Sequence, residues 1–310
     1  MQDKKISLVI PFYNEKNRII ETIKLIKSQV IEPDEIIFVN SFSKDNSELK
    51  LRLFLKNYRY KKNKIKIFNN KKNTPSESKN MGIIQSNYEN ICFMDVGLDV
   101  DNFWIKNIKK LILSKKYSYV QGKYYFKPNS ILDKMFLSQT FGINTYGNCI
   151  PSSCFKKKIF NKIGFFDNFR SGYDRVWLKK LKLSKISFQN NYNSPINYLK
   201  NNSGKNIFQI FKKIFYYSHT TIGLKQYNLG KQYLILSIFL FLMLISGYHL
   251  EMIILYFIYR GIYVPFKKNF KDTKKKFDLS LIFFGPIMGI IIDISRLLGF
   301  IFGYVKKIIK

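Results

Sequence analysis

Short apolar runs alternate with helical patterns over the first 125 residues of the chain. The runs cover residues 6–10, 36–39, 65–68 and 91–94, and each one stops abruptly at polar residues. Strands that alternate with helices in this way form a mostly parallel sheet that helices cover on both faces. We therefore predict an α/β domain whose ligand site lies beyond the carboxyl ends of its strands.

Helical periods fill the segments between these runs. The clearest begins with a capping box, in which Thr74 stands at the N-cap, Pro75 at the first helical position and Glu77 at the third. In such a box the threonine hydroxyl accepts a hydrogen bond from the backbone N–H of the third helical residue. The sequence predicts a helix from this box through Gln85. Further helices are predicted over residues 18–29 and 46–58.

The last third of the chain is far more apolar than the first two. Residues 233–248 carry no charge, residues 252–259 continue the apolar character, and residues 279–292 form another apolar segment. Each run alone fits a buried core helix as well as a membrane segment. Their clustering beside the lysine-rich stretch 267–276 favours C-terminal membrane helices, with that stretch on the cytoplasmic side.

The number of membrane crossings stays open. The first apolar region is either one long helix that carries His249 and Glu251, or a hairpin of two short segments that turns near Gly247. The final segment is basic at both ends, and Asp293 and Arg296 lie one turn apart, where they can pair. That pattern favours an interfacial or re-entrant helix over a third crossing.

The chain is strongly basic, with 53 Lys and Arg against 20 Asp and Glu and a formal net charge of +33. Such a charge suggests nucleic acid or an anionic membrane surface as a partner. Only 7 of the basic residues are Arg, the side chain that reads phosphates and guanines bidentately. Because no nucleic-acid-binding motif is present either, we predict a membrane partner and no nucleic acid.

The cysteines and the N-terminus favour a reducing, cytoplasmic setting. Three cysteines are too few and odd in number for a disulfide framework, and two histidines cannot complete a zinc cluster with them. The residues before the first apolar run lack the charged head, apolar middle and small-residue site of a signal peptide. We therefore expect the N-terminal part of the protein in the cytoplasm.

Polar clusters follow the predicted strands. They lie at residues 11–15, 40–45, 76–82 and 95–99 and contain an aromatic ring, amides, hydroxyls, a lysine and carboxylates. An aromatic face can stack on a base, and a carboxylate can bind a hard divalent cation that carries phosphates. Neither a Walker nor a G-x-G-x-x-G element is present. The clusters therefore suit a nucleotide diphosphate better than a mononucleotide in a glycine loop.

The order of these motifs resembles that of family-two glycosyltransferases of GT-A fold. Residues 6–45 resemble the family's "V-I-P-x-Y-N-E" and "D-D-G-S-x-D" passages, and residues 76–104 resemble "A-R-N-x-G … D-x-D … W-L". Residues 151–167 and 172–178 resemble the later "P-S-S … G-G-F" and "E-D … R-L" passages. The likeness covers residues 5–190, in order, which is far more specific than a single motif.

The resemblance implies roles for individual residues. Asp174 would be the catalytic general base, Tyr13 would stack on the nucleotide base, and Lys79 would contact the diphosphate in place of an arginine. Asp95 would contact a Mg²⁺ or Mn²⁺ cofactor. The implied donor-binding residues are Pro11, Tyr13, Glu15, Asn40, Lys79 and Asp95, and the acceptor-side residues are Ser152, Ser153 and Trp177. For Trp177, a place in the core is the alternative.

The chain departs from the family pattern at three pocket positions. Asn40 replaces a base-binding Asp but keeps a carbonyl acceptor. Gly97 replaces the second Asp of D-x-D, so that Asp99 can serve only if the loop bends back, and Tyr173 stands where a Glu is common. These departures keep open a catalytically inactive membrane-bound scaffold as one alternative.

The resemblance and the apolar third together predict a membrane-associated, inverting, hexosyltransferase-type enzyme. It would move a sugar from a nucleotide-diphosphate donor to a hydroxyl of a lipid-linked or envelope glycan, in cell envelope polysaccharide biosynthesis. Transfer to a polyprenyl phosphate is the nearest alternative reaction. The predicted regions are a GT-A-like catalytic domain at residues 1–205, a connecting or interfacial helix at 206–230 and a membrane-associated region at 231–310.

Overall fold

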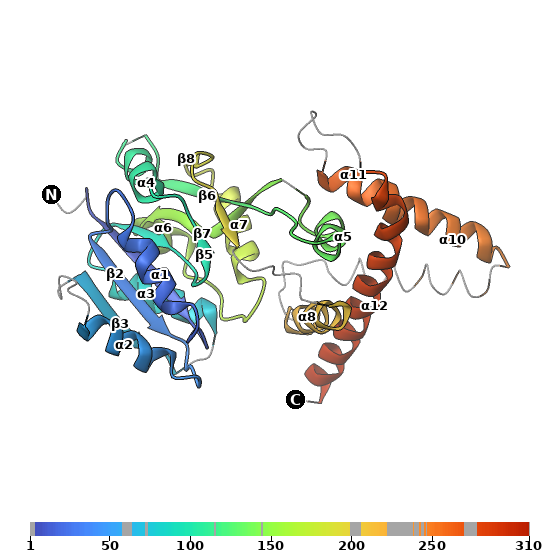
Figure 1. Cartoon of the computed structure of the whole chain (residues 1–310), viewed down its shortest axis with the longest axis horizontal. Coiled ribbons are helices and arrows are strands. Elements are labelled where there is room, and N and C mark those ends of the chain that lie inside the picture. The colour runs from blue at the N-terminus through green and yellow to red at the C-terminus, as the bar shows by residue number, and fades with distance from the viewer. Residues whose placement is uncertain are drawn as a thin grey trace. The chain divides into compact units, whose positions relative to one another are not determined.

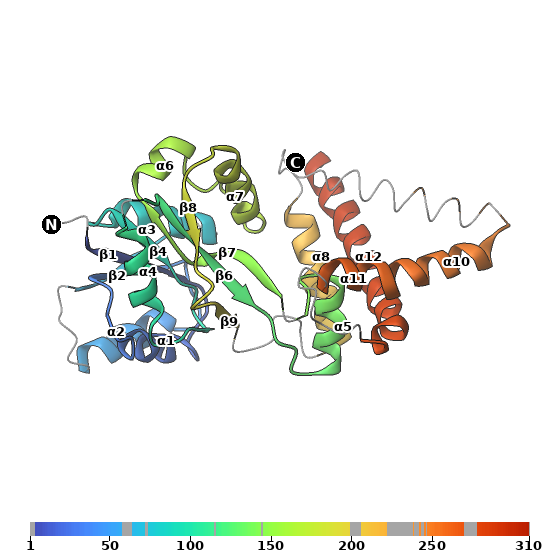
Figure 2. The same ribbon diagram turned by 90° about the horizontal axis from the view of Figure 1, so that it is seen from above.

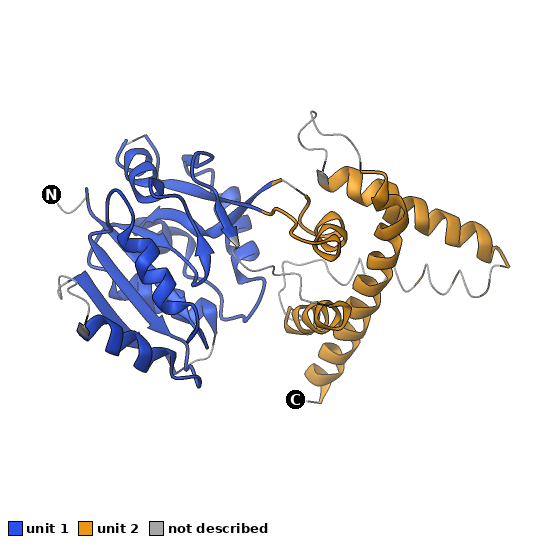
Figure 3. Ribbon diagram, in the orientation of Figure 1, with its two compact units in different colours: residues 1–125, 146–200 blue, residues 126–145, 201–310 orange. Residues whose placement is uncertain are grey.

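The computed structural model describes residues 4–57, 64–71, 74–114, 116–143, 145–198, 206–221, 247–269 and 278–309, and also residues 238, 242 and 245. The chain divides into two compact units (Figure 3). Unit 1 contains residues 1–125 and 146–200, and unit 2 contains residues 126–145 and 201–310. The chain therefore passes between the units after residues 125, 145 and 200.

Unit 1 is built on one mixed sheet (Figure 1). Within the described residues the sheet has nine strands, in the order β3-β2-β1-β4-β7-β6-β9-β5, with β8 paired to β6. The strands are β1 (Ile6–Phe12), β2 (Glu35–Asn40), β3 (Ile65–Asn69), β4 (Asn90–Phe93), β5 (Leu98–Asp99), β6 (Tyr119–Tyr125), β7 (Tyr146–Lys156), β8 (Phe188–Asn190) and β9 (Ile196–Tyr198).

The first four strands are parallel, as the sequence predicted, and the rest of the sheet is mixed. β1 pairs in parallel with β2 and β4, and β2 with β3. β7 then runs antiparallel to both of its neighbours, β4 and β6. The carboxyl ends of β1 and β2 therefore lie side by side, with Phe12 opposite Asn40, and the end of β4 lies beside Val9.

Helices cover both faces of this sheet because the strands are apolar on both sides. Alternate residues of β1 belong to two separate clusters, Ile6, Leu8 and Ile10 to one and Val9 to the other. The first cluster is completed by α1 (Ile19–Lys27), α2 (Ser47–Asn57) and α4 (Trp104–Ile112). The second is completed by α3 (Pro75–Gln85), α6 (Lys158–Ile163) and α7 (Tyr173–Leu183). Figure 2 shows α1 and α2 on the opposite side of the sheet from α6 and α7.

Helix α3 confirms the predicted boundaries, but its cap differs from the predicted box. Thr74 is the N-cap and Pro75 the first helical residue, yet the threonine side chain caps no backbone N–H. Its hydroxyl instead donates to Asn168 Oδ1 at 3.0 Å. Later in the helix, Gly82 lies directly against the side chain of Val9 in β1. A side chain at this position would collide with β1, so the glycine sets how closely α3 approaches the sheet.

Unit 2 is helical. Its elements are α5 (Ile131–Gln139), α8 (Ile207–Thr220), α10 (His249–Ile258), a π-helical turn η3 (Tyr259–Tyr263), α11 (Val264–Asn269) and α12 (Ser280–Ile308). The unit's core joins side chains of α5, α8 and α12: Met135, Phe136, Leu137, Ile210, Ile214, Met288 and Ile292. The predicted apolar run at residues 233–248 falls mostly outside the described residues.

Helix α12 is longer than the apolar segment from which it was predicted. It has 29 residues, and among the described residues it alone is long and apolar enough to cross a membrane. Within its most apolar window, 39% is buried inside the protein. Length and composition therefore give weak support to membrane association, and the interfacial or re-entrant arrangement stays a prediction.

The acidic residue of α12 pairs with a different arginine from the one predicted. Arg260 in η3 donates from Nε to Asp293 Oδ2 at 3.0 Å and from Nη2 to Oδ1. Tyr256 donates a further hydrogen bond to the same carboxylate, and Gln139 of α5 donates to the Arg260 carbonyl. The predicted partner Arg296 lies one turn along α12 itself, whereas Arg260 contacts Asp293 from a neighbouring element, η3.

Candidate functional site at the strand ends

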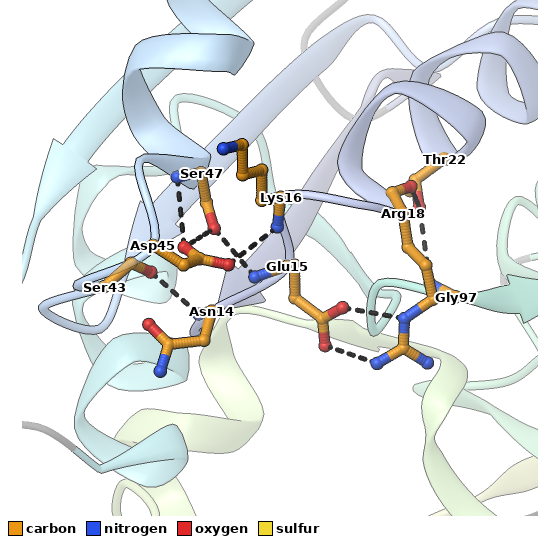
Figure 4. Close-up of polar contacts among 9 residues, drawn as sticks. All are labelled: Asn14, Glu15, Lys16, Arg18, Thr22, Ser43, Asp45, Ser47 and Gly97. Carbon is orange, nitrogen blue, oxygen red and sulfur yellow. Dashed lines mark hydrogen bonds and ion pairs between the residues drawn. The ribbon is translucent and has the colours of Figure 1, made fainter.

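The loops that follow β1 and β2 are hydrogen-bonded to each other (Figure 4). The backbone N–H of Asn14 donates to Ser43 Oγ at 3.0 Å, and Asn14 Oδ1 accepts from the N–H of Lys44 at 2.8 Å. The N–H of Lys16 donates to Asp45 Oδ2 at 2.9 Å. Asn14 adopts a left-handed backbone, φ 55°, which asparagine tolerates better than most residues. These contacts hold both loops in one conformation beside the predicted base-binding ring of Tyr13.

Asp45 supports the start of α2 rather than a ligand. Its Oδ1 accepts from the N–H of Ser47 at 3.1 Å and from the hydroxyl of the same residue. Burial opposes ionisation of Asp45, but hydrogen bonds from Ser47 and Lys16 outweigh that effect and lower its pKa. Asp45 therefore stabilises the turn that leads into α2.

Glu15 forms a two-pronged ion pair with Arg18, a residue that the sequence analysis did not single out. Arg18 Nε lies 2.9 Å from Glu15 Oε2, and Nη2 donates to Oε1 at 3.1 Å. Burial raises the pKa of Glu15 although the guanidinium opposes the shift. The spacing of three residues at the start of α1 is the one signal in the sequence that could have predicted this pair.

Arg18 also lies against Gly97, where the family motif has its second carboxylate. A Cβ atom on Gly97 would stand 2.8 Å from Arg18 Nη1, and the residue has φ +78°. This backbone conformation suits glycine and strains other residues. Figure 4 shows Arg18 beside Gly97, with its guanidinium paired to the Glu15 carboxylate. The chain then enters β5, so Asp99 is a strand residue paired with Asn197 rather than part of a loop that bends back.

A buried lysine joins three elements at the same edge of the sheet. Lys79 of α3 donates from Nζ to Asp95 Oδ1 at 3.0 Å, just after β4, and to the Tyr173 hydroxyl of α7 at 2.9 Å. The Lys79 side chain is 3% exposed and that of Asp95 36%. The structure therefore brings together two residues that the motif placed on the donor side, and it adds Tyr173.

The charge of this lysine is stabilised where it lies. Burial lowers the pKa of Lys79, but the Asp95 carboxylate and the Tyr173 hydroxyl more than reverse the effect, and the net pKa is raised. Burial raises the pKa of Tyr173 to about 12. Lys79 is therefore a cation and Tyr173 a neutral hydroxyl at physiological pH.

Asp174 lies beside this group, and Tyr13 lies against Arg170. Asp174 follows Tyr173 in the first turn of α7, and both Asp95 and Asp174 contribute to raising the pKa of Tyr173. Tyr13 is half-buried, and its ring lies 5.6 Å from the guanidinium carbon of Arg170. A cation over one face of an aromatic ring is an attractive arrangement. Arg170 is a second residue that the sequence analysis did not assign to the site.

Asn40 and Pro11 are held within the fold. Asn40 is 5% exposed, its Nδ2 donates to Glu48 at 2.8 Å, and its Oδ1 accepts from the N–H of Ser43 at 2.9 Å. Pro11 lies inside β1, paired with Val39. The amide of Asn40 thus shapes the loop after β2, and its base-binding role stays a prediction that depends on the second lone pair of Oδ1.

The three residues predicted on the acceptor side are all buried. Trp177 is 1% exposed and donates its indole N–H to the Gly164 carbonyl at 2.8 Å, which agrees with the alternative of a place in the core. Ser152 and Ser153 are fully buried as well. The Ser153 hydroxyl donates to the Cys149 carbonyl and accepts from a backbone N–H of β6, which joins β7 to its neighbour.

Comparison with known proteins gives the chain a family. The family model for glycosyl transferase family 2 matches residues 7–182, more than half of the chain. An uncharacterized glycosyltransferase of Rickettsia bellii is 29% identical over 191 residues, which are 56% of this chain and 26% of that protein. An uncharacterized glycosyltransferase of Rickettsia conorii is 25% identical over 251 residues, 76% of this chain and 38% of that protein. The chain therefore spans well under half the length of both curated relatives.

Among solved structures, the mannosyltransferase PcManGT from Pyrobaculum calidifontis, in complex with GDP-Man and Mn²⁺, superposes with a TM-score of 0.51. The match is 14% identical and covers 70% of this chain and 64% of that one. An identity this low shows similarity of fold alone. Together with the family model, it confirms the fold that the order of the motifs implied. The chain belongs to glycosyl transferase family 2 and has its GT-A fold.

Proposed function

We propose that the protein transfers a sugar from a nucleotide-diphosphate donor to a hydroxyl group of an acceptor. The observation that carries the proposal is the cation of Lys79, buried between Asp95 and Tyr173 at the carboxyl ends of the strands. A fixed buried cation suits an anionic leaving group, because charge stabilisation is strongest where water is excluded. PcManGT, which shares the fold, was solved with a nucleotide-diphosphate sugar, GDP-Man.

In this proposal Asp174 acts as the general base. Its carboxylate takes the proton of the acceptor hydroxyl while that oxygen bonds to the anomeric carbon. The bond from the anomeric carbon to the diphosphate breaks on the opposite face, and its electron pair leaves with the diphosphate. The sugar is therefore transferred with inversion. Its identity as a hexose rests on the family resemblance alone.

The metal implied by the family resemblance does not fit the residues present. Within the described ranges, no three His, Cys, Asp or Glu side chains come together as a metal site. Asp95 Oδ1 already accepts from Lys79, and Gly97 faces the Arg18 guanidinium instead of supplying a second carboxylate. Mg²⁺ in nucleotide sites is held through one or two carboxylates and the phosphates. A metal here would have to share the single carboxylate of Asp95 with Lys79, which makes a poor set of ligands. No step in the proposed reaction uses a metal.

The donor proposal predicts selective stabilisation by nucleoside diphosphates. The full-length protein in detergent should unfold at a higher temperature with one of UDP, GDP, CDP or dTDP, and much less with the matching monophosphate. Ligand at about 100 times its Kd stabilises a protein by roughly 2.7 kcal/mol. Differential scanning fluorimetry measures the shift. Equal effects of diphosphate and monophosphate, or no effect of either, would contradict the proposal.

Once the nucleotide is known, a transfer assay with the matching nucleotide sugar tests the alternatives. An inactive scaffold would bind the diphosphate but release none from the matching nucleotide sugar when acceptor lipids are added. Transfer to a polyprenyl phosphate would give a product that carries the sugar on that phosphate. A hydroxyl acceptor, as proposed here, would give a glycosidic bond instead.

We further propose that unit 2 attaches the protein to the cytoplasmic membrane, with unit 1 facing the cytoplasm and an acceptor that is a lipid-linked or envelope glycan. Support comes from α10, which has no buried residue, and from large exposed apolar side chains on α10 and α12. They include Leu250, Ile254, Phe257, Phe283, Ile287 and Ile294. Burial of such surface in lipid is favourable.

Membrane attachment predicts a specific fractionation result. The full-length protein should sediment with membranes, stay there through a high-salt wash and dissolve on addition of detergent. The salt wash is the control, because a chain with a formal net charge of +33 would adhere to anionic lipid through electrostatics that salt screens. Complete release by salt alone would show that the apolar helices are not embedded.

A further inference from the structure

We propose that the donor diphosphate is bound without a divalent cation, by the side chains of Lys79 and Arg18. This inference rests on the proposed function and adds how the leaving group is neutralised. Its basis is a pair of cations at the two positions of the D-x-D motif. Lys79 is bound to the carboxylate of Asp95, and Arg18 lies against Gly97.

The Arg18 guanidinium fills the space that a second carboxylate would need. A Cβ atom on Gly97 would come within 2.8 Å of Nη1, 3.0 Å of Cδ and 3.2 Å of Cζ of Arg18. Arg18 is held in this position by Nε and Nη2, which contact Glu15. Nη1 is the nitrogen that faces Gly97. The guanidinium is planar and matches phosphate oxygens well, so a diphosphate that reached Gly97 would meet a suitable donor.

Lys79 is oriented just as firmly. Its ammonium carries three N–H groups, and the contacts with Asp95 and Tyr173 use two of them. Both contacts also keep the lysine charged despite its burial. Asp95 is then a positioning residue for the lysine rather than the ligand of a metal. The Tyr173 hydroxyl, which stands where a glutamate is common in the family, supports the cation from the other side.

The charges of the group disfavour a metal and favour a phosphate. Lys79 and Arg18 are each paired with a carboxylate, Asp95 and Glu15, so a divalent ion that approached either carboxylate would also approach a cation. Like charges at close range repel each other, and the repulsion grows as water is excluded. An anionic diphosphate gains the opposite interaction, because Lys79 is already desolvated and both cations are held in place by their carboxylate partners.

The experiment compares nucleotide binding with and without metal. The full-length protein in detergent is titrated with UDP and GDP, once in EDTA and once with Mn²⁺ or Mg²⁺, and Kd is measured by calorimetry. We expect the Kd of the nucleotide that binds to be the same in both conditions, within about twofold. A twofold change in Kd corresponds to a binding free energy of RT ln 2, which is less than the loss of one weak contact.

Two substitutions and one control complete the test. Lys79→Met and Arg18→Gln should each weaken binding in EDTA by about 10–100-fold, the effect of losing a hydrogen bond to a charged group. Arg18 is partly exposed, so its replacement keeps the test valid if Lys79→Met folds poorly. Lys109→Met removes a comparable ion pair, with Asp34, outside the site and should leave Kd unchanged.

The outcomes separate this inference from the function on which it rests. Binding that appears only with Mn²⁺ or Mg²⁺ would overturn the inference and leave the proposed function intact. Wild-type affinity of both variants in EDTA would do the same. An absence of UDP and GDP binding in either condition would overturn the proposed function for these nucleotides, and the inference with it.

Discussion

Replacement of Asp174 by asparagine is expected to slow sugar transfer by about 10²–10⁴-fold while the affinity for the donor stays unchanged. The substitution keeps the size of the side chain but removes its ability to take a proton from the acceptor hydroxyl. Asp174 lies in the first turn of α7, next to Tyr173. We expect Lys79 and Arg18, and not Asp174, to hold the diphosphate, so the affinity for the donor should not change. Single-turnover transfer rates and nucleotide Kd values, measured on the same preparation, test both parts.

Asp167→Asn is the matched control for this variant. Asp167 lies in the segment before α7 and accepts hydrogen bonds from Lys180 Nζ at 3.1 and 2.9 Å. The change is chemically identical, but its carboxylate has a structural partner, so the transfer rate should stay within a few-fold of wild type. An equal loss in both variants would indicate that α7 has moved. A wild-type rate for Asp174→Asn would refute its assignment as the base.

Trp177→Ala is expected to lower the free energy of unfolding by about 3–5 kcal/mol, the cost of removing a large buried aromatic side chain. The ring packs between Phe155, Phe160 and Phe166, with centroid distances of 5.1, 5.2 and 4.9 Å. The substitution also removes the hydrogen bond to the Gly164 carbonyl. The denaturant midpoint of the full-length protein in detergent measures the loss.

Phe165→Ala controls for the loss of an aromatic ring at the edge of the same cluster. Phe165 is 39% exposed, and its ring stacks on Phe160 at 6.2 Å. Its removal should cost about 1 kcal/mol or less, as surface substitutions usually do. If Trp177→Ala unfolded at the wild-type midpoint and instead weakened acceptor binding, the ring would have to contact acceptor, and its assignment to the core would be wrong.

The parallel half of the sheet was predictable because buried parallel strands are continuous apolar runs. The four predicted runs correspond to β1 to β4, within two residues of their observed ends. The mixed half was not predictable in the same way. β7 contains Gly147, Asn148, Pro151 and two serines, and its antiparallel pairing with β4 joins segments about 60 residues apart. Only the packing of the whole unit selects such a pairing.

The site was predictable where a motif gives a residue's place along the chain, and not where the contact depends on packing. Lys79 and Asp95 were assigned to the donor side, but their ion pair requires α3 to lie close on β1, which Gly82 permits. Arg18 belongs to no motif and was missed. For Trp177 the motif allows a place on the acceptor side or in the core, and its four-residue spacing from Tyr173 and Leu181 favours the buried face of a helix.

The excursion of the chain between β6 and β7 decides how unit 1 could be obtained by itself. Residues 126–145 group with unit 2, and Met135, Phe136 and Leu137 of α5 pack against residues of α8 and α12. A protein cut after residue 205 would keep α5 without most of those partners, and the bared helix would promote aggregation. Tyr125 and Tyr146 face each other across the two antiparallel strands. Strands in that register can be closed by a two-residue hairpin turn. Exchanging the whole excursion for an Asn-Gly turn would therefore yield unit 1 as one continuous chain, suited to crystallisation.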